Sequence, residues 1–381
     1  MPELSIGQAT SLALITMLAL LLALPAACAQ QHDFTVTEVD LPENVTVVDT
    51  MTIDRSGNVW FMDSSGPELY LYEPDKNNFT EIAMPGLQGA EFTGMSVDAS
   101  GKVWFADRDG NRVGMFDPAT GGFKVYDFPL ELAPSDLVFY NGFLWIGCKE
   151  EIGRLDIKNE YLLDHFLKKR NSYIMDVELD EETGDIWFVE SAMNRVGGYL
   201  KRYNDNVEYD IPTPDSCPTC LDMDSAKTLW FIEAKTNRLG SFDTINEKFR
   251  EHDAPAIDGK KPSLNHVAVD KNGHVWVTDP ANNRLIKYFP EHDAFGSIGL
   301  KEGNNMPTLI DIDEKGNLWF VESGTGKLAM LQAGPDAGMP SASPIPSPSA
   351  EPSSTPKPSP GFSVAALAIA GLILLAFKKR L

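Results

Sequence analysis

The chain has 381 residues, of which 43% are hydrophobic and 23% are charged, a composition typical of globular rather than disordered proteins. Its 32 Lys and Arg against 55 Asp and Glu give a formal net charge of −23. This acidity excludes the basic surface that nucleic-acid binding requires. Four cysteines are too few for a scaffold held together by disulfides.

The chain begins with an apolar run from Ser11 to Leu24, followed by a stretch of small residues that ends at Ala29. This order predicts a signal peptide over residues 1–29, cleaved after Ala29, although no Lys or Arg precedes the apolar run. A lipoprotein attached through Cys28 and an uncleaved N-terminal anchor remain as alternatives.

Tryptophan recurs along the chain with spacings of 41 to 46 residues, which is the period of β-propeller blades. The clearest copy, from Thr93 to Pro129, divides into four short segments bounded by Gly, Asn, Asp or Pro, as four hairpin-linked strands would be. We therefore predict an all-β, seven-bladed β-propeller over residues 30–333. Its seven tryptophans are Trp60, Trp104, Trp145, Trp187, Trp230, Trp276 and Trp319.

The last copy of the repeat ends after its third strand, near Met330, so its fourth strand is missing. Residues Phe34–Pro42 (FTVTEVDLP) repeat the pattern of the fourth strand Phe123–Pro129 (FKVYDFP). We predict that this N-terminal strand completes the last blade and closes the ring. Closure would leave no free sheet edge between the first and last blades.

The C-terminal part differs from the propeller in composition. Residues 334–360 are rich in Pro and Ser and predict an extended stalk, because such a segment cannot bury a core. Residues 361–381 contain the apolar run Phe362–Phe377 and end in Lys-Lys-Arg-Leu. An apolar run with a basic stop predicts a membrane segment with the body of the protein outside the cell.

The sequence Pro360-Gly361-Phe362, followed by the apolar run and the basic end, resembles the PGF-CTERM sorting tail of archaeal surface proteins. This resemblance implies that an archaeosortase removes the tail and that a lipid anchor replaces it. The alternative is an ordinary C-terminal membrane helix. In both cases we expect a monomer at the cell surface, attached to the membrane through the C-terminal tail.

The repeat combines an apolar inner strand, the motif Gly-x-hydrophobic-Trp-Phe-x-acid and the motif Asn-Arg-hydrophobic-Gly, as at Gly101–Asp107 and Asn111–Gly114. This combination resembles the virginiamycin B lyase (streptogramin lyase) family, from about Phe34 to Leu331. The resemblance implies a Mg²⁺-dependent lyase that opens the ester of a cyclic depsipeptide by elimination. It also implies a His in a Pro-His turn before the inner strand of each of the last two blades, an acid before the second His, and another acid after the last Trp.

The chain departs from that pattern in the last two blades. Thr308 and Met306 stand where the second His and its acid are expected, and Asn265 stands where the first His is expected. His266 comes one residue later, which directs its side chain to the other side of the strand. Only Glu322, after the last Trp, matches. Since Thr cannot replace His as a base at neutral pH, the sequence favours a binding module without catalysis.

The alternative function is a lyase in which His266 and Glu322 act as displaced acid–base residues and Mg²⁺ is the cofactor. In the binding hypothesis neither a metal site nor a cofactor is expected. Its partner would be a small molecule, a surface protein or a glycan. Polar residues at the start of the inner strands are expected to face the channel mouth and to form the binding ring. These ligand-binding candidates are Asp49, Thr93, Ser135, Thr219, Asn265 and Thr308.

A carboxylate stands three residues after the Trp in six of the seven copies, Glu322 among them. In four copies an Arg of the next strand follows it, namely Arg112, Arg195, Arg238 and Arg284. Cross-strand ion pairs explain this repetition better than metal binding does.

The pair Cys217 and Cys220 is a disulfide candidate, because the expected location is outside the cell. Asn44 and Asn78 are glycosylation candidates, since each begins an Asn-x-Thr sequence. His252 and His274 fall in outer strands and turns, where we expect them at the surface.

Overall fold

The computed structural model describes residues 35–332, apart from 168–171, 258 and 302, together with residues 345–346. The predicted signal peptide, the predicted membrane segment and all but two residues of the predicted stalk lie outside the described residues. In the part of the chain that is described, no helix has both the length and the apolar character needed to cross a membrane.

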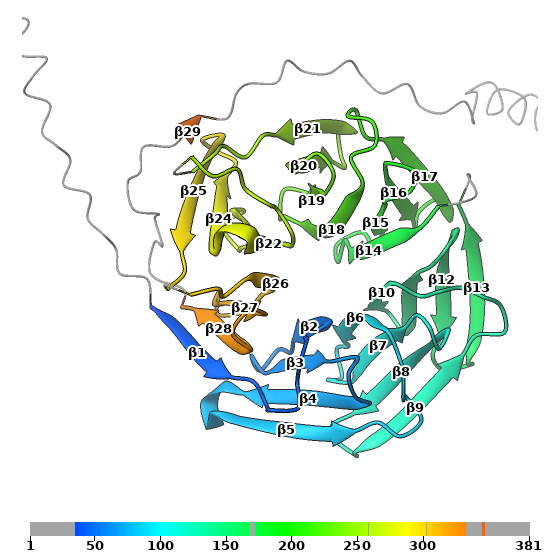
Figure 1. The fold of residues 1–381 in the computed structure, drawn as a ribbon. Helices are drawn as coiled ribbons and strands as arrows, with labels where there is room; N and C mark the ends of the chain where they lie inside the picture. Colours follow the sequence, from blue (N-terminus) through cyan, green and yellow to red (C-terminus); the bar gives the residue numbers. More distant parts are fainter. Residues whose placement is uncertain (1–34, 168–171, 258, 302, 333–344, 347–381) are drawn as a thin grey trace, which may run out of the picture.

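The described strands form seven antiparallel sheets arranged as blades around a common axis (Figure 1). Blade 1 contains β2 (Thr50–Ile53), β3 (Val59–Met62), β4 (Glu68–Glu73) and β5 (Asn78–Ala83). Blade 2 contains β6 (Phe92–Val97), β7 (Val103–Asp107), β8 (Arg112–Asp117) and β9 (Gly122–Asp127). Blade 3 contains β10 (Asp136–Tyr140), β11 (Phe143–Gly147), β12 (Glu151–Asp156) and β13 (Tyr161–Phe166).

The second half of the ring repeats this arrangement. Blade 4 contains β14 (Ile174–Leu179), β15 (Ile186–Glu190), β16 (Arg195–Leu200) and β17 (Asp205–Asp210). Blade 5 contains β18 (Pro218–Met223), β19 (Thr228–Glu233), β20 (Arg238–Asp243) and β21 (Lys248–His252). Blade 6 contains β22 (Val267–Val269), β23 (Val275–Asp279), β24 (Arg284–Phe289), β25 (Ala294–Gly299) and the short β29 (Ile345–Pro346). The described residues include the 3₁₀ turns η1 (Pro74–Lys76) and η2 (Pro280–Asn282).

Blade 7 confirms the predicted closure of the ring. It contains β26 (Pro307–Ile312), β27 (Leu318–Glu322), β28 (Lys327–Leu331) and the N-terminal β1 (Val36–Asp40). Strand β1 pairs with β28 in antiparallel register, from Val36 opposite Leu331 to Asp40 opposite Lys327. The prediction of an all-β, seven-bladed propeller whose last blade is closed by the N-terminal strand is therefore confirmed.

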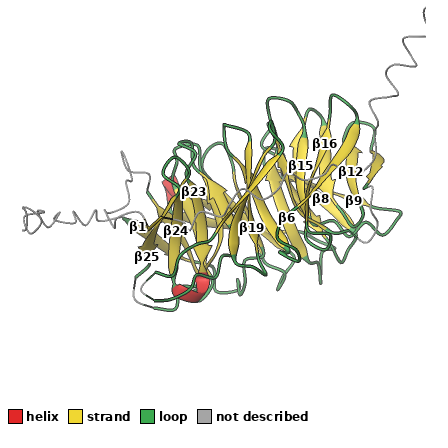
Figure 2. Ribbon diagram, turned by 90° about the horizontal axis from the view of Figure 1, so that it is seen from above, coloured by secondary structure: helices red, strands yellow, loops and turns green. Residues whose placement is uncertain are grey.

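The burial of each strand follows its position in the blade. Every residue of the second strands β7, β15 and β23 is buried, because both sheet faces pack against neighbouring blades. The outermost strand β5, in contrast, has no buried residue. Figure 2 shows the strands lying between two layers of loops.

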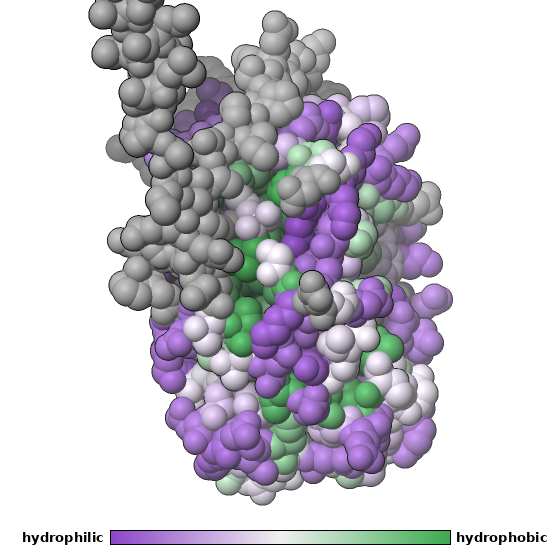
Figure 3. All heavy atoms as spheres, turned by 60° about the vertical axis from the view of Figure 1, so that its left-hand side comes forward, coloured by the Kyte–Doolittle hydropathy of each residue, from purple (hydrophilic) through white to green (hydrophobic). Residues whose placement is uncertain are grey.

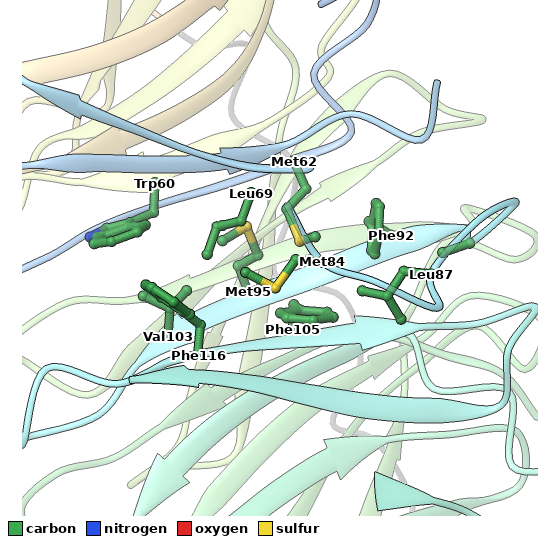
Figure 4. Packing of buried hydrophobic residues seen from close by; sticks show 11 residues of the cluster. Trp60, Met62, Leu69, Met84, Leu87, Phe92, Met95, Val103, Phe105 and Phe116 are labelled. Atoms are coloured by element: carbon green, nitrogen blue, oxygen red, sulfur yellow. The ribbon is translucent and has the colours of Figure 1, made fainter. Parts of the chain in front are cut away.

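The hydrophobic core consists of a ring of clusters between adjacent blades. The cluster between blades 1 and 2 contains Trp60 and Met62 from the first blade and Met95 and Phe105 from the second, with Met84 from the loop that joins the blades (Figure 4). Each fully buried large apolar side chain contributes roughly 1.5–3 kcal/mol. On the outside, the face shown in Figure 3 carries many hydrophilic side chains with smaller hydrophobic patches between them.

The strand registers distinguish two faces of the propeller. In blade 7, Pro307 lies opposite Glu322, and Lys327 lies opposite both Glu322 and Asp40. All four residues are therefore on the face where the inner strand begins, which we call the mouth face. We call the opposite face, where the two inner strands of each blade are joined by a turn, the hairpin face. Val36 and Leu331 lie on the hairpin face.

Candidate functional site

The channel mouth and its supporting asparagines

The predicted binding ring lies at the start of the seven inner strands, and most of its polar groups are engaged within the protein. Ser135 is buried and donates a hydrogen bond of 2.9 Å to the carbonyl of Gly147. The Thr93 hydroxyl donates to the carbonyl of Pro134 at 3.1 Å. Asp49 Oδ2 accepts a hydrogen bond of 2.5 Å from the backbone N–H of Ser64.

The other three ring positions are Thr219, Asn265 and Thr308. Thr308 lies 2.8 Å from Ser323, hydroxyl to hydroxyl, so its oxygen is held inside blade 7. Thr219 is half-buried at the start of β18. Among the six ring candidates only Asn265 is exposed. Asn265 is therefore the ring residue best placed to contact a ligand.

The Asn of the Asn-Arg motif positions the loops that form the mouth. In each of four blades this Asn has a left-handed backbone, with φ between 51° and 58°. Its side-chain oxygen accepts a backbone N–H from the loop that leads into the next inner strand. The pairs are Asn111 with Leu132 at 2.8 Å, Asn194 with Ser216 at 2.7 Å, Asn237 with Leu264 at 2.8 Å, and Asn283 with Asn305 at 2.9 Å. Each of these blades thus fixes the mouth loop of its neighbour.

The acidic lumen

Five carboxylates that the sequence analysis missed lie on the inner strands of four blades. Three of them accept a backbone N–H of the next inner strand: Asp136 from Val177 at 3.1 Å, Asp176 from Leu221 at 2.8 Å, and Asp222 from Val269 at 2.6 Å. Asp311 accepts from Ile53 in the same way and so links blade 7 to blade 1. The fifth carboxylate is Glu178. We call the region around the axis that these five residues line the acidic lumen.

Burial raises the pKa of most carboxyl groups that line the acidic lumen. It raises the pKa of Asp222 to about 7 and that of Asp311 to about 6, against the opposing effect of their backbone hydrogen bonds. Burial also raises the pKa of Asp136 and Glu178, and the negative charges of Asp176 and Asp222 add to this effect. Asp222 and Asp311 therefore exchange protons near neutral pH.

His266 belongs to the same region. Its imidazole, just before β22, interacts electrostatically with Asp176, Asp311 and Asp222 and therefore lies beside the acidic lumen. Burial lowers its pKa, and the three carboxylates oppose this shift. The imidazole is consequently neutral at pH 7, a form that can accept a proton.

Residues of the expected acid–base pair and metal site

The structure does not join His266 to Glu322. Glu322 is completely buried, and one carboxylate oxygen accepts a hydrogen bond of 3.2 Å from the Thr325 hydroxyl. Its other oxygen has no partner among the described residues. No hydrogen bond or ion pair links it to His266 in this part of the chain.

Among the described residues, no three His, Cys, Asp or Glu side chains are grouped so that they could hold a metal ion. Glu322, the one residue that matches the family's acids, has its nearest polar partner in Thr325 of the same turn. The described residues around Glu322 therefore do not fit Mg²⁺.

The predicted ion pairs of the second-strand carboxylates form in two blades and not in two others. Arg112 and Arg284 bind Asp107 and Asp279, each at 2.6 Å. Where the carboxylate is Glu, the arginine turns outward instead: Arg195 binds Asp210 at 2.7 Å, and Arg238 binds Asp253 at 2.6 Å. The longer Glu190 and Glu233 side chains bind hydroxyls of Ser172 and Thr236, and burial raises the pKa of each carboxyl to about 7.

Cysteines, glycosylation candidates and a buried histidine

The predicted disulfide is not present in the structure, where Cys217 and Cys220 are both free thiols. Both glycosylation candidates are exposed, and Asn78 lies at the start of the outermost strand β5. The amide of Asn44 donates to the Tyr70 hydroxyl at 2.8 Å and to a Glu81 oxygen at 3.2 Å.

The prediction that His252 is a surface residue is wrong, because only 6% of it is exposed. Its ring lies 3.2 Å from the Ser241 hydroxyl, 3.0 Å from the Tyr288 hydroxyl and 3.4 Å from Asp293 Oδ1. This order of Ser, His and Asp is that of a hydrolase triad, but Ser241 is only 4% exposed and packed inside the sheet. The cluster therefore serves to join blade 5 to blade 6.

Relationship to known proteins

Solved structures of other proteins share the propeller fold of this chain. No curated protein matches the chain in sequence. Among solved structures, virginiamycin B lyase from Staphylococcus aureus superposes with a TM-score of 0.70 at 22% identity, covering 79% of this chain and all of the lyase. The same values hold for a catalytically inactive variant of that lyase with quinupristin.

A more distant structure shares the fold as well. Hydrazine synthase from Kuenenia stuttgartiensis gives a TM-score of 0.65 at 10% identity, over 77% of this chain and 98% of the matched chain. Structural likeness at these identities shows the propeller fold and not the activity. The model of the virginiamycin B lyase family matches residues 138–355, which is more than half of the chain. The chain belongs to the virginiamycin B lyase family.

Proposed function

We propose that this protein is a non-catalytic binding module of the cell surface, whose ligand binds across the channel mouth. The observation that carries the proposal is the hydrogen bonding of the Thr308 hydroxyl. Its hydroxyl stands at the position of the family's second His, and it is hydrogen-bonded at 2.8 Å to Ser323. An alcohol in a hydrogen bond to another alcohol cannot take up a proton at neutral pH.

The first expected His is also replaced. Asn265 is exposed at the start of blade 6, and its backbone N–H donates to the carbonyl of Thr278 at 3.1 Å. An amide side chain offers both a donor and an acceptor, and it does not titrate. Such a group suits recognition of a polar ligand, such as a glycan or a peptide, better than proton transfer.

The face on which the first and last strands of blade 7's outer pair, β1 and β28, have their free ends supports a tethered module. Strand β28 ends and β1 begins on the hairpin face, opposite the mouth. A stalk and anchor attached after β28 would therefore hold the hairpin face toward the membrane and turn the mouth outward. A ligand outside the cell would reach Asn265 without passing the tether.

This proposal is tested by binding to arrays of cell-surface glycans and cyclic depsipeptides. Asn265→Ala is compared with Asn272→Ala, an exposed asparagine in the same blade but in the hairpin-face turn. We expect Asn265→Ala to weaken binding of any captured ligand about tenfold while Asn272→Ala leaves it unchanged. Equal affinity of the wild type and Asn265→Ala for that ligand would contradict binding at the mouth.

One observation favours a second candidate, a lyase that acts on a cyclic ester. The His266 imidazole lies among Asp176, Asp222 and Asp311, and burial keeps it neutral. A neutral imidazole can remove a proton next to a carbonyl, as an elimination requires. If this candidate is correct, the protein opens a cyclic lactone and His266→Ala abolishes the reaction. Turnover that survives in His266→Ala would exclude His266 as the base.

A further inference from the structure

Two cysteines at the mouth occupy backbone conformations that such residues rarely adopt. Cys217 has a φ of 56° and Cys220 a φ of 38°, both in the left-handed region. In β18 the register jumps between Thr219 and Leu221, so Cys220 is the extra residue of a β-bulge. Non-glycine residues in this region are uncommon and persist where the surrounding structure holds them, often at functional sites.

Cys220 links blade 5 to blade 6. Its Sγ–H donates to the backbone carbonyl of Asn265 at 3.4 Å, and its side chain packs against the apolar cluster between the two blades. Burial raises the pKa of this thiol, so it keeps its proton and remains a hydrogen-bond donor. The thiol form of Cys220 therefore helps to hold the exposed ring residue Asn265 in place.

The contact continues from Asn265 into the rest of the mouth. The N–H of Asn265 donates to the carbonyl of Thr278 at 3.1 Å, and the N–H of His266 donates to the Thr278 hydroxyl at 3.0 Å. That hydroxyl in turn donates to the carbonyl of Thr308 at 2.8 Å. One series of hydrogen bonds thus leads from Cys220 through blade 6 to blade 7.

We propose that Cys217 and Cys220 form a redox switch that controls the order of the mouth. In the dithiol form, Cys220 binds the carbonyl of Asn265 and ties the two blades together. In the disulfide form, the sulfur of Cys220 has no hydrogen to donate and is drawn toward Cys217. The loop that carries Asn265 and His266 is then released. This inference does not depend on the proposed binding function.

The chemistry requires an external disulfide as oxidant, such as oxidised glutathione. The thiolate of Cys217, which lies outside the apolar cluster, attacks one sulfur of the oxidant and releases one thiolate. The released thiolate takes the proton of the Cys220 thiol, and the Cys220 sulfur then attacks the sulfur of Cys217 and displaces the second small thiol. Two protein thiols and one disulfide yield one protein disulfide and two small thiols, so electrons and protons balance.

The full-length protein in mild detergent is equilibrated with defined ratios of reduced and oxidised glutathione. Peptide mass spectrometry after alkylation measures the Cys217–Cys220 disulfide, and hydrogen exchange measures the peptide 264–268. We expect the disulfide to form and the exchange in this peptide to rise about twofold, as the loss of one weak S–H···O hydrogen bond would allow. Peptides of blade 2 serve as the internal reference and should not change.

Two variants separate the switch from general effects of the oxidant. Cys217→Ser cannot form the disulfide but keeps the Cys220 contact, so the oxidant should leave exchange of 264–268 unchanged. Cys220→Ala removes the donor and should exchange rapidly at every glutathione ratio. The proposal is overturned if the dithiol resists oxidation at all ratios, if the disulfide forms without a change at 264–268, or if Cys217→Ser responds as the wild type does.

Discussion

Asn237 Oδ1 accepts a hydrogen bond of 2.8 Å from the backbone N–H of Leu264, the residue immediately before the mouth residue Asn265. The same amide group donates to the carbonyl of Pro262. One side chain in the turn of blade 5 thus holds two backbone groups of the loop that begins blade 6. The Asn of the repeated Asn-Arg motif therefore positions the loops that form the mouth.

Asn237→Ala should destabilise the protein by about 2–3 kcal/mol, because it leaves an N–H and a carbonyl of the loop without their partner. Urea denaturation measures this change. The matched control is Asn272→Ala, an exposed asparagine of blade 6 in the hairpin-face turn, which should change stability by about 0.5 kcal/mol or less. Similar midpoints for both variants would show that the Asn237 contacts do not support the fold.

Asp222→Asn should stabilise the protein at pH 8 and have little effect at pH 4. The folded pKa of Asp222 is about 7, above the value of about 3.9 expected in the unfolded chain. The folded protein therefore binds more protons between these two values, and its stability falls as the pH rises through this window. The amide oxygen of Asn can still accept the N–H of Val269, which Asp222 binds at 2.6 Å.

The expected gain for Asp222→Asn at pH 8 is roughly 1–2 kcal/mol, reduced from the full linkage value because the lumen is partly solvated. Thermal unfolding at pH 4, 6 and 8 measures it. A variant that is less stable than the wild type at pH 8, or one whose effect is the same at all three pH values, would disprove the raised pKa.

Asp98→Ala should destabilise blade 2 by about 2–4 kcal/mol, because four hydrogen bonds meet on this carboxylate. It accepts the backbone N–H and the hydroxyl of Ser100 at 2.8 and 2.6 Å, the backbone N–H of Lys102 at 3.1 Å, and the indole N–H of Trp104 at 3.0 Å. The exposed Asp109 of the same blade is the control, and Asp109→Ala should leave the unfolding midpoint nearly unchanged. Trp fluorescence during denaturation follows both variants.

In a host that attaches N-linked glycans, Asn78 should be modified in preference to Asn44. Both residues are exposed, but the amide of Asn44 is bound by Tyr70 and Glu81, whereas that of Asn78 makes only a 3.5 Å contact with the Thr80 hydroxyl. Glycopeptide mass spectrometry measures the occupancy of each site, with Asn78→Gln as the control that removes the first. Greater occupancy of Asn44 than of Asn78 would contradict this assignment.

The fold could be predicted because the sequence features that indicate it recur in every blade. Each Trp marks a second strand buried on both faces, and the unmatched strand at the N-terminus indicated how the ring closes. The Asn-Arg motif was visible as well, but its role in holding the next loop depends on contacts between blades. A repeated polar residue beside a turn could have indicated such a role.

The acidic lumen could not be predicted in the same way, because its residues do not share one position of the repeat. Asp176 lies opposite Val189, two residues after Trp187, whereas Asp222 lies directly opposite Trp230. They come together only because the ring brings different strand positions to one axis. The burial of His252 was missed for a similar reason, since its hydroxyl partner Tyr288 belongs to the next blade.

The central claim, binding without catalysis, is tested most directly by incubating the protein with quinupristin, the compound present in a structure of a related lyase. Liquid chromatography and mass spectrometry follow the lactone with and without Mg²⁺, and virginiamycin B lyase from Staphylococcus aureus serves as the positive control. We predict that the lactone remains intact under both conditions with this protein. A linear product that accumulates with time and with protein concentration would contradict the claim.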